Sequence, residues 1–326
     1  MVKHTTDTNG IGYEWEYAKV KDDRTIWQKI VMGIYNPNTH EVLGRSLRSW
    51  GGILLFYLVF YSSLAVLFGI CLKLLLSTLD ERTPHFTLSN SIIGTNPGLG
   101  FRPRSRNVED GSLIYYEAKN STNVDTWVNS LDDFLAVYKN KTLLPDGGSN
   151  QQQGCNHHFY PENGKVCDFR VDINMGNCTS EKKYGYPDGQ PCVFIKLNKI
   201  FDWKPEFYNM SNLPDGMPKD LKNTISNKLF NDPNEVNTVW VSCEGETPSD
   251  RENIGPIDLH PEGFPGYYYP FTNKKDYLSP LIAVHFKKPK KHTLINVECR
   301  AWARNIVYRR SLQNREGSVH FELMID

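Results

Sequence analysis

Six cysteines beyond residue 150 are the side chains best placed to do chemistry, and that chemistry is disulfide formation. They are Cys155, Cys167, Cys178, Cys192, Cys243 and Cys299. Fifteen pairings are possible, and the spacing favours neighbours. Cys178 and Cys192 enclose YGYPDGQP, whose Asp188-Gly189 predicts a tight turn between two strands that a disulfide could cross-link. Cys155 and Cys167 enclose a similarly short loop, which leaves Cys243 and Cys299 for each other.

A zinc site is the alternative for the first two cysteines. Cys155, His157, His158 and Cys167 together offer thiolate and imidazole ligands. An oxidising compartment would favour the disulfide over the metal. We therefore expect no metal site, and we interpret His157 and His158 as surface residues, with pH sensing as an alternative role.

The compartment follows from the distribution of cysteines and glycosylation sequons. Residues 1–49 contain neither. Four Asn-x-Ser/Thr sequons lie beyond residue 100, at Asn120, Asn140, Asn177 and Asn209. Six cysteines and four sequons in one part of the chain predict that residues 77–326 occupy the oxidising lumen or the outside of the cell, glycosylated and disulfide-bonded.

Common catalytic signatures are missing from the sequence. It contains no phosphate-binding G-x-x-x-x-G-K-[ST] loop, no H-E-x-x-H and no G-x-S-x-G. It also lacks the Asp-x-Asp motif through which many membrane-anchored glycosyltransferases hold a metal-nucleotide, and we expect Asp132 and Asp133 to be solvated. We therefore expect neither catalytic residues nor a cofactor. Because 37 Lys and Arg balance 37 Asp and Glu, no net charge favours nucleic acid as a partner.

One segment has the length and composition of a membrane span. From Trp50 to Leu72 there are 23 residues without a charge, which at about 1.5 Å per residue cross a hydrocarbon core of roughly 30 Å. We predict a single-pass signal-anchor helix over residues 50–76, a cytoplasmic tail over 1–49 and an extracellular domain over 77–326. Lysine and arginine settle this orientation only weakly, so it depends on the cysteines and sequons.

The interior of this helix carries two tyrosines that a lipid-facing segment does not need. Tyr61 lies about 16 Å along the helix from Trp50, too deep for an interfacial aromatic belt. Tyr57, Tyr61, Ala65 and Gly69 follow one another at intervals of four and form a stripe that runs from aromatic to small. Such a stripe favours close approach of another helix. Rings that merely face lipid, or a homodimer, are the alternatives.

The elements that position the cysteines read as short strands. Val239, Val241 and Cys243 share one face, as do Ile295, Val297, Cys299, Ala301 and Ala303, while Asn296, Glu298, Arg300 and Arg304 point the other way. Further strands are predicted at 112–118, 192–200, 279–286 and 318–325. Apolar residues from Trp127 to Tyr138 predict a helix that is capped by Asp125 or Thr126. Together these predict an immunoglobulin-like sandwich with an inserted helix.

Several separated motifs resemble one family. The segment 34–50, IYNPNTHEVLGRSLRSW, precedes Phe56-Tyr57, Phe60-Tyr61 and Leu64-Ala65 in an F-Y-x-x-F-Y-x-x-L-A pattern. Farther along come YGYPDGQPCVFIKLNKI, YLSPLIAVHF, NVECRAWARNI and the terminal VHFELMI. With these in register through almost the whole chain, the sequence resembles the beta subunits of the sodium/potassium-transporting ATPase.

This resemblance implies an immunoglobulin-like ectodomain, sequential disulfides and a non-catalytic role at the plasma membrane. The implied partner is a catalytic P-type alpha subunit, alongside membrane lipid and a small single-span regulatory subunit. The positions that match its contacts with the alpha subunit are Tyr57, Phe60, Tyr61, Ala65, Tyr268, Tyr269 and Pro270. Asn177 matches a glycosylated position of the family. The family's Y-Y-P-Y-Y motif changes here at Phe271 and Thr272, where the aromatic hydroxyl is lost.

Three alternatives remain for the function. A proton/potassium pump has a beta subunit that shares most of these motifs. A free-standing type II adhesion or receptor glycoprotein would show the same topology, and so would a lumenal enzyme.

Overall fold

The computed structural model describes residues 25–37, 39–80, 82–144, 151–310 and 315–326. The chain divides into two units, Met1–Leu79 and Asp80–Asp326. Residues 1–24, about half of the predicted cytoplasmic tail, lie outside the described residues.

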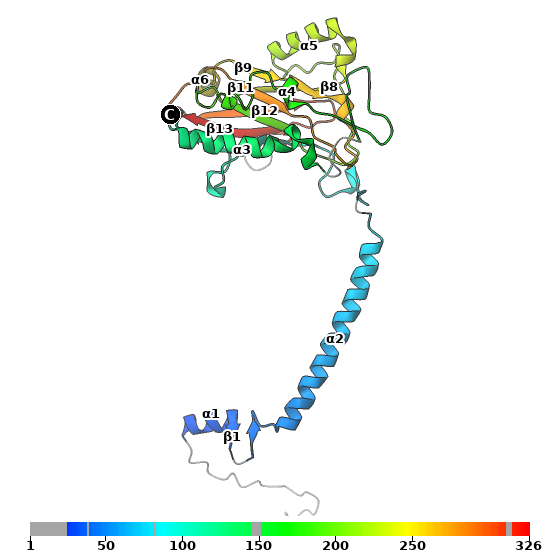
Figure 1. Ribbon diagram of the computed structural model, residues 1–326, viewed down its shortest axis with the longest axis vertical. Coiled ribbons are helices and arrows are strands. Elements are labelled where there is room, and N and C mark those ends of the chain that lie inside the picture. Colours follow the sequence, from blue (N-terminus) through cyan, green and yellow to red (C-terminus); the bar gives the residue numbers. More distant parts are fainter. Residues whose placement is uncertain (1–24, 38, 81, 145–150, 311–314) are drawn as a thin grey trace, which may run out of the picture. The chain divides into compact units, whose positions relative to one another are not determined.

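The described part of the first unit, from residue 25 on, contains two helices joined by a small hairpin (Figure 1). Helix α1 spans Ile26–Ile34 and begins with a capping box, in which the side chains of Thr25 and Gln28 each accept a hydrogen bond from the other residue's backbone N–H. Strands β1 (Tyr35–Asn36) and β2 (Glu41–Val42) pair antiparallel. Helix α2 spans Leu47–Ser77.

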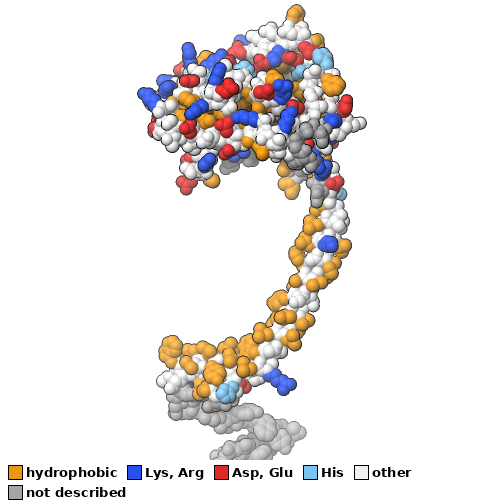
Figure 2. Space-filling view, viewed as in Figure 1, with side chains coloured by type: hydrophobic (Ala, Val, Ile, Leu, Met, Phe, Trp, Pro, Cys, Tyr) orange, Lys and Arg blue, Asp and Glu red, His pale blue; other side chains and the backbone are white. Residues whose placement is uncertain are grey.

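Within the described residues, α2 is the one helix long and apolar enough to cross a membrane. It has 31 residues, a stretch of 18 of them has a mean hydropathy of 2.3, and none of its side chains is buried within the chain. Hydrophobic side chains run along its whole visible length, among white backbone and other side chains (Figure 2). The helix is longer than its uncharged run because the backbone already bonds helically from Ser46, whose carbonyl accepts from Trp50 N–H at 3.0 Å.

The second unit is built on two sheets. The five-stranded sheet has the order β10-β8-β12-β13-β4, and the four-stranded sheet has the order β3-β7-β11-β9. The strands of the first are β4 (Leu113–Tyr116), β8 (Thr238–Gly245), β10 (Gly263–Pro265), β12 (Ile295–Trp302) and β13 (Ser318–Ile325). Those of the second are β3 (Leu99–Arg102), β7 (Cys192–Leu197), β9 (Ile257–His260) and β11 (Ile282–Phe286). A short pair, β5 (Gln152–Gln153) and β6 (Val166–Cys167), lies apart from both.

The two sheets pack face to face around a common core. Phe321 of β13 stacks on Phe101 of β3, with ring centroids 5.1 Å apart, and meets Phe286 of β11 edge-on at 6.1 Å. All three rings are almost fully buried. The predicted mainly-β sandwich that follows a single membrane helix is thereby confirmed.

The predicted inserted helix is α3 (Ser121–Lys139), and its predicted cap, Asp125 or Thr126, is wrong. Asn120 caps it, because its side-chain oxygen accepts from the Asn123 N–H at 3.3 Å. The helix packs on β4, where the Trp127 indole N–H donates to the Tyr115 carbonyl at 3.0 Å. The remaining helices are α4 (Val171–Asn174), α5 (Lys219–Asn231) and α6 (Pro248–Asn253).

The segment between Cys178 and Cys192 is not the predicted hairpin. Only Cys192 lies in a strand, and the chain from Lys183 to Gly189 forms tight turns instead. Two of its side chains, Tyr184 and Tyr186, are buried in the core, so the segment folds down onto the sheet and does not extend as a ribbon.

The outer face of the five-stranded sheet is covered, although its strand pattern predicted a half-buried sheet. Helix α5 packs Leu221 and Ile225 on Trp240 and Trp302, which face each other across β8 and β12. Glu298 lies on the same outer face. It points away from the core, as predicted, but is only 6% exposed. The prediction of which residues point inward and which outward is therefore correct, whereas the prediction that the outward residues meet water is wrong.

Candidate functional site

The two tyrosines of α2 belong to a ladder of four aromatic rings. Tyr57 stacks on Tyr61 with ring centroids 5.8 Å apart, and Phe56 stacks on Phe60 at 6.0 Å. The two stacks meet edge-on, at 5.4 Å in each turn. The rings hold one another along the helix, which reduces the side-chain entropy that a partner's binding would cost.

No described residue covers this ladder. Tyr57 and Tyr61 are 48% and 59% exposed, and neither hydroxyl has a hydrogen-bond partner in the described chain. Ala65 is also exposed, and a Cβ built on Gly69 would meet no described atom within 4 Å. Nothing in this unit therefore requires a small residue at position 69. The stripe is free to contact another helix, whose groups could satisfy the hydroxyls.

In the second unit, the tyrosine side chains of the Tyr268-Tyr269-Pro270 segment point into the protein. Tyr268 is 5% exposed, and its hydroxyl donates to the Asp168 carbonyl at 3.0 Å. Burial raises the pKa of both Tyr268 and Tyr269. The Tyr269 hydroxyl is buried with no described partner, and its ring meets Trp203 edge-on at 5.7 Å. Pro270, joined to Tyr269 by a cis peptide bond, is partly exposed.

One changed position of this motif, Phe271, packs against a lysine. The Lys199 ammonium lies 4.9 Å from the Phe271 ring centroid and 5.3 Å from that of Tyr277. Burial lowers the pKa of Lys199, and repulsion from Lys196 adds to the effect. The Phe271 ring thus makes a cation–π contact that needs no hydroxyl.

All four sequon asparagines are exposed, as an acceptor site for a glycan requires. In two of the sequons the hydroxyl of the third residue donates a hydrogen bond to the asparagine side chain. Thr142 Oγ1 donates to Asn140 Oδ1 at 2.7 Å, and Ser211 Oγ donates to Asn209 Oδ1 at 2.8 Å. Asn177 Oδ1 instead accepts from Lys182 at 2.9 Å. At Asn120 the same oxygen caps α3. In each case the bond uses Oδ1 and leaves Nδ2, the atom that carries an N-glycan, for modification.

The three disulfides of the structure are Cys155–Cys167, Cys178–Cys192 and Cys243–Cys299, the pairs that the spacing favours. The first pair has no thiolates left for zinc. His157, expected at the surface, is half-buried with its ring edge-on to Tyr267, whereas His158 is exposed and bonds Asp232 at 3.0 Å. Across the described ranges, no group of three or more His, Cys, Asp or Glu residues is arranged to hold a metal ion.

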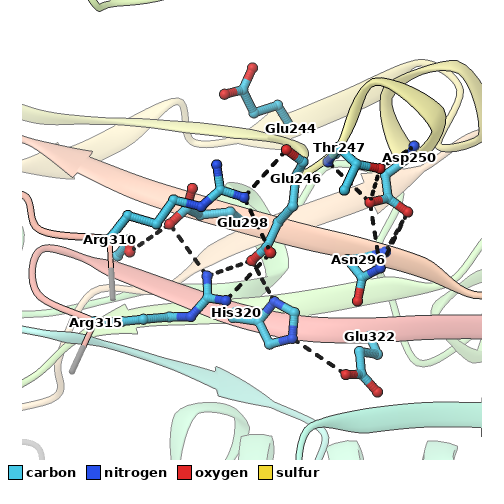
Figure 3. Close-up of polar contacts among 12 residues, drawn as sticks. Glu244, Glu246, Thr247, Asp250, Asn296, Glu298, Arg310, Arg315, His320 and Glu322 are labelled. Carbon is cyan, nitrogen blue, oxygen red and sulfur yellow. Dashed lines mark hydrogen bonds and ion pairs between the residues drawn. The ribbon is translucent and has the colours of Figure 1, made fainter. Parts of the chain in front are cut away.

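A cluster of charged groups lies on the outer face of the five-stranded sheet, and the sequence analysis missed it (Figure 3). Glu246, which follows β8, accepts from His320 Nδ1 at 2.6 Å and from both Arg315 and Arg310. Glu298 accepts from Ser318 and Tyr308, each at 3.0 Å. The residues of this cluster come from β12, β13 and the segments beside these strands. They lie close together only because the strands pair.

The acids of this cluster are satisfied within it. Burial raises the pKa of Glu246, but hydrogen bonds from Arg315 and His320 and their positive charges outweigh it, so the pKa lies below its ordinary value. Asp250 is 4% exposed and bonds Thr247 and Asn296, which likewise hold its pKa low against the effect of burial. Because each carboxylate is bound to several donors, the cluster is built to hold the fold together.

Asp132, predicted to be solvated, is also bound. It accepts from Tyr184 at 2.6 Å and from Lys139 at 2.7 Å, and so ties α3 to the turn segment. Asp133 is exposed, as predicted. The identity of Asp132's partners could not be read from a helical pattern, because Tyr184 lies 52 residues away.

Comparison with known proteins gives a consistent result. The family model described as "Sodium / potassium ATPase beta chain" matches residues 20–321. The chain is 48% identical over 320 residues to the Drosophila melanogaster "Sodium/potassium-transporting ATPase subunit beta-2", covering 97% of each chain. It is 44% identical over 294 residues to that organism's subunit beta-1, covering 90% of this chain and 91% of the relative. Against the Homo sapiens subunit beta-2 it is 30% identical over 314 residues, covering 92% and 94%.

Proposed function

The chain belongs to the sodium/potassium ATPase beta-chain family, and from this premise we propose that it is the accessory beta subunit of a sodium/potassium pump. It binds a catalytic alpha subunit, supports the folding, stability and membrane delivery of that subunit, and modulates potassium and sodium transport. ATP hydrolysis and ion movement take place on the alpha subunit, and this chain has no catalytic residue or cofactor of its own.

The observation that carries this proposal is the uncovered stripe of α2. Tyr57 and Tyr61 place two hydroxyls in the membrane-spanning segment, where lipid acyl chains offer no hydrogen-bond partner. The described chain offers them no partner either. A helix of the alpha subunit that lies against Tyr57, Phe60, Tyr61 and Ala65 would supply acceptors. An interhelical bond of this kind is worth roughly 0.6 to 2 kcal/mol.

A second contact involves the Tyr268-Tyr269-Pro270 segment. Since the Tyr268 side chain is part of the ectodomain's own core, its role in this proposal is to fix the segment and not to touch the partner. The partly exposed Pro270 and the backbone beside it then make the contact. Tyr269 contributes its orphan hydroxyl if the partner's binding rearranges the segment.

The orientation is type II at the plasma membrane. The N-terminal tail faces the cytoplasm, and the ectodomain with its four exposed sequons and three disulfides faces outward. The remainder of α2 faces membrane lipid, and a small single-span regulatory subunit could share the bilayer with the complex.

Co-purification tests the proposal. The native protein is solubilised in a mild detergent, captured through an antibody to its ectodomain, and its companions are identified by mass spectrometry. We expect a large multi-pass P-type ATPase chain in stoichiometric amount. Recovery of a sodium/potassium pump separates this proposal from a proton/potassium pump. Recovery of the chain without any such ATPase would leave a free-standing glycoprotein and end the proposal.

A further inference from the structure

Helix α1 has one apolar face that nothing in the described chain covers. Successive residues of a helix are about 100° apart, so five of its nine side chains fall within an arc of about 140°. These are Ile26, Trp27, Ile30, Val31 and Ile34. Their exposed fractions range from 48% to 78%, and no residue of the helix is buried. Gln28, Lys29, Met32 and Gly33 make up the other side.

The hairpin after α1 fixes this helix close to the start of the membrane span. The Leu43 N–H donates back to the Ile34 carbonyl at 2.9 Å, which ties the end of α1 to the far strand of the hairpin. The Trp50 indole N–H then donates to the Val42 carbonyl at 2.8 Å, which ties that strand to the first turns of α2. Two hydrogen bonds therefore connect Ile34 to the residue at which the uncharged run begins.

This tether limits how far α1 can lie from the bilayer. A helix of nine residues is about 13 Å long, and the headgroup region extends some 5 to 8 Å beyond the hydrocarbon core on each side. If α1 projected straight into the cytoplasm, its five large apolar side chains would stand in water. If it lies along the surface, the same side chains enter the boundary between headgroups and acyl chains, as those of interfacial helices do.

We propose that α1 is an interfacial helix that lies on the cytoplasmic surface of the membrane and inserts its Trp27–Ile30–Ile34 face into lipid. The continuity of its apolar surface with that of α2 favours lipid over a protein as the occupant (Figure 2). Arg45 and Arg48 lie between the hairpin and the uncharged run of α2, where their charges suit anionic headgroups. The inference does not depend on which pump subunit the chain binds.

Spin labels on opposite faces of α1 test the proposal in the full-length chain. On a Cys71→Ala background, Ile30→Cys or Gln28→Cys supplies the only free thiol, because the other six cysteines are in disulfides. The labelled chains are placed in nanodiscs of phosphatidylcholine and phosphatidylserine. Collision with oxygen, which concentrates in lipid, is compared with collision with a water-soluble nickel complex.

We expect the oxygen-to-nickel ratio to be several-fold higher at position 30 than at position 28, with the former label about 5 to 10 Å below the headgroups. Equal ratios dominated by nickel would place α1 in water and overturn the proposal. Protection of position 30 from both reagents would mean that a protein covers the face, which overturns it equally.

Trp27 gives a second measurement that needs no label. The fluorescence of wild-type protein minus that of Trp27→Phe isolates this indole from the other six tryptophans. In nanodiscs whose phosphatidylcholine carries bromine on the acyl chain, the difference signal should fall strongly. An undiminished difference signal would contradict the proposal even if the cysteine variants failed to fold.

Discussion

Cys243 and Cys299 face each other across two neighbouring strands of one sheet, with their Cα atoms 4.0 Å apart. Their bridge joins β8 to β12, which already share backbone hydrogen bonds, and so does not connect the two layers of the sandwich as the bridge of an antibody domain does. It closes a loop with a sequence separation of 56, within which lie α6 and strands β9 to β11. Holding this long loop closed in the unfolded chain is its main contribution.

Removing this bridge should cost more stability than removing a short one. In the chain-entropy model Cys243→Ala with Cys299→Ala loses about 4 kcal/mol, and Cys155→Ala with Cys167→Ala, whose separation is 12, about 3 kcal/mol. Urea unfolding of the full-length chain in detergent measures both. Peptide mapping without reduction provides the control, and a crossed pair in the wild-type protein would invalidate the comparison.

Truncating the two tyrosines of α2 should weaken binding of the alpha subunit. Tyr57→Ala with Tyr61→Ala removes two rings and two hydroxyls from the proposed contact face, and we expect a several-fold loss of co-purified partner and of surface delivery. Val59→Ala with Val66→Ala is the control, because both side chains lie on the opposite side of the helix, about 140° to 200° around it from the two tyrosines. Equal losses from both pairs would remove the assignment of the face.

The Asn120 sequon allows a glycan to be separated from a helix cap. Asn120→Gln and Thr122→Ala both abolish the sequon, so each should shift the glycoprotein on a gel by one glycan. Only Asn120→Gln also removes the side chain that bonds Asn123 N–H, and it should be less stable by about 1 kcal/mol. Thermal unfolding after enzymatic deglycosylation checks the difference. If the two variants melt alike, Asn120 does not act as the cap.

Stability at acid pH should depend on Glu246. Its pKa is lower in the folded chain than in the unfolded one, so the unfolded state binds more protons in this range. The stabilisation is complete above the unfolded pKa, near 4.5, and is lost as the pH falls through the folded value. Glu246→Gln should therefore flatten the fall in unfolding free energy below pH 4.5.

At pH 7 the same change should destabilise the second unit by about 3 to 5 kcal/mol, because it leaves Arg315 without its closest carboxylate. Glu244→Gln, two residues earlier, is the control. Its half-exposed side chain pairs with Arg251 at 3.5 Å, and we expect little effect from it. An unchanged acid profile in Glu246→Gln would show that other carboxylates dominate acid unfolding.

Local patterns predicted those parts of the fold whose signal is local. The alternation in β12 and β13 and the apolar positions of α3 identified these elements, and short spacing favoured the disulfides that the structure contains. Helix α5 was missed because its buried side consists chiefly of Leu221 and Ile225, too few apolar residues for a helical stripe to stand out. Strands β3 and β9, of four residues each, are too short to show a period.

The charged cluster could not have been predicted by the same means. Glu246 and His320 are 74 positions apart, and the pattern of each strand marks its polar residues only as facing outward. Whether an outward face meets water or another segment depends on the register between strands and on the chain that crosses them. Similarly, the family's tyrosine motif suggested a contact surface, whereas packing turned Tyr268 inward.

Because β4 pairs with β13, which lies far along the chain, β4 is synthesised long before its partner strand. Tyr115 and Asp326, whose side chains bond at 3.1 Å, are 211 residues apart, and a ribosome adding about 5 to 20 residues per second needs roughly 10 to 40 seconds to travel between them. Throughout that interval β4 lacks the strand that pairs with it. A nascent chain of this protein is therefore open to pairing with a wrong strand, or to capture by a chaperone, until β13 has been synthesised.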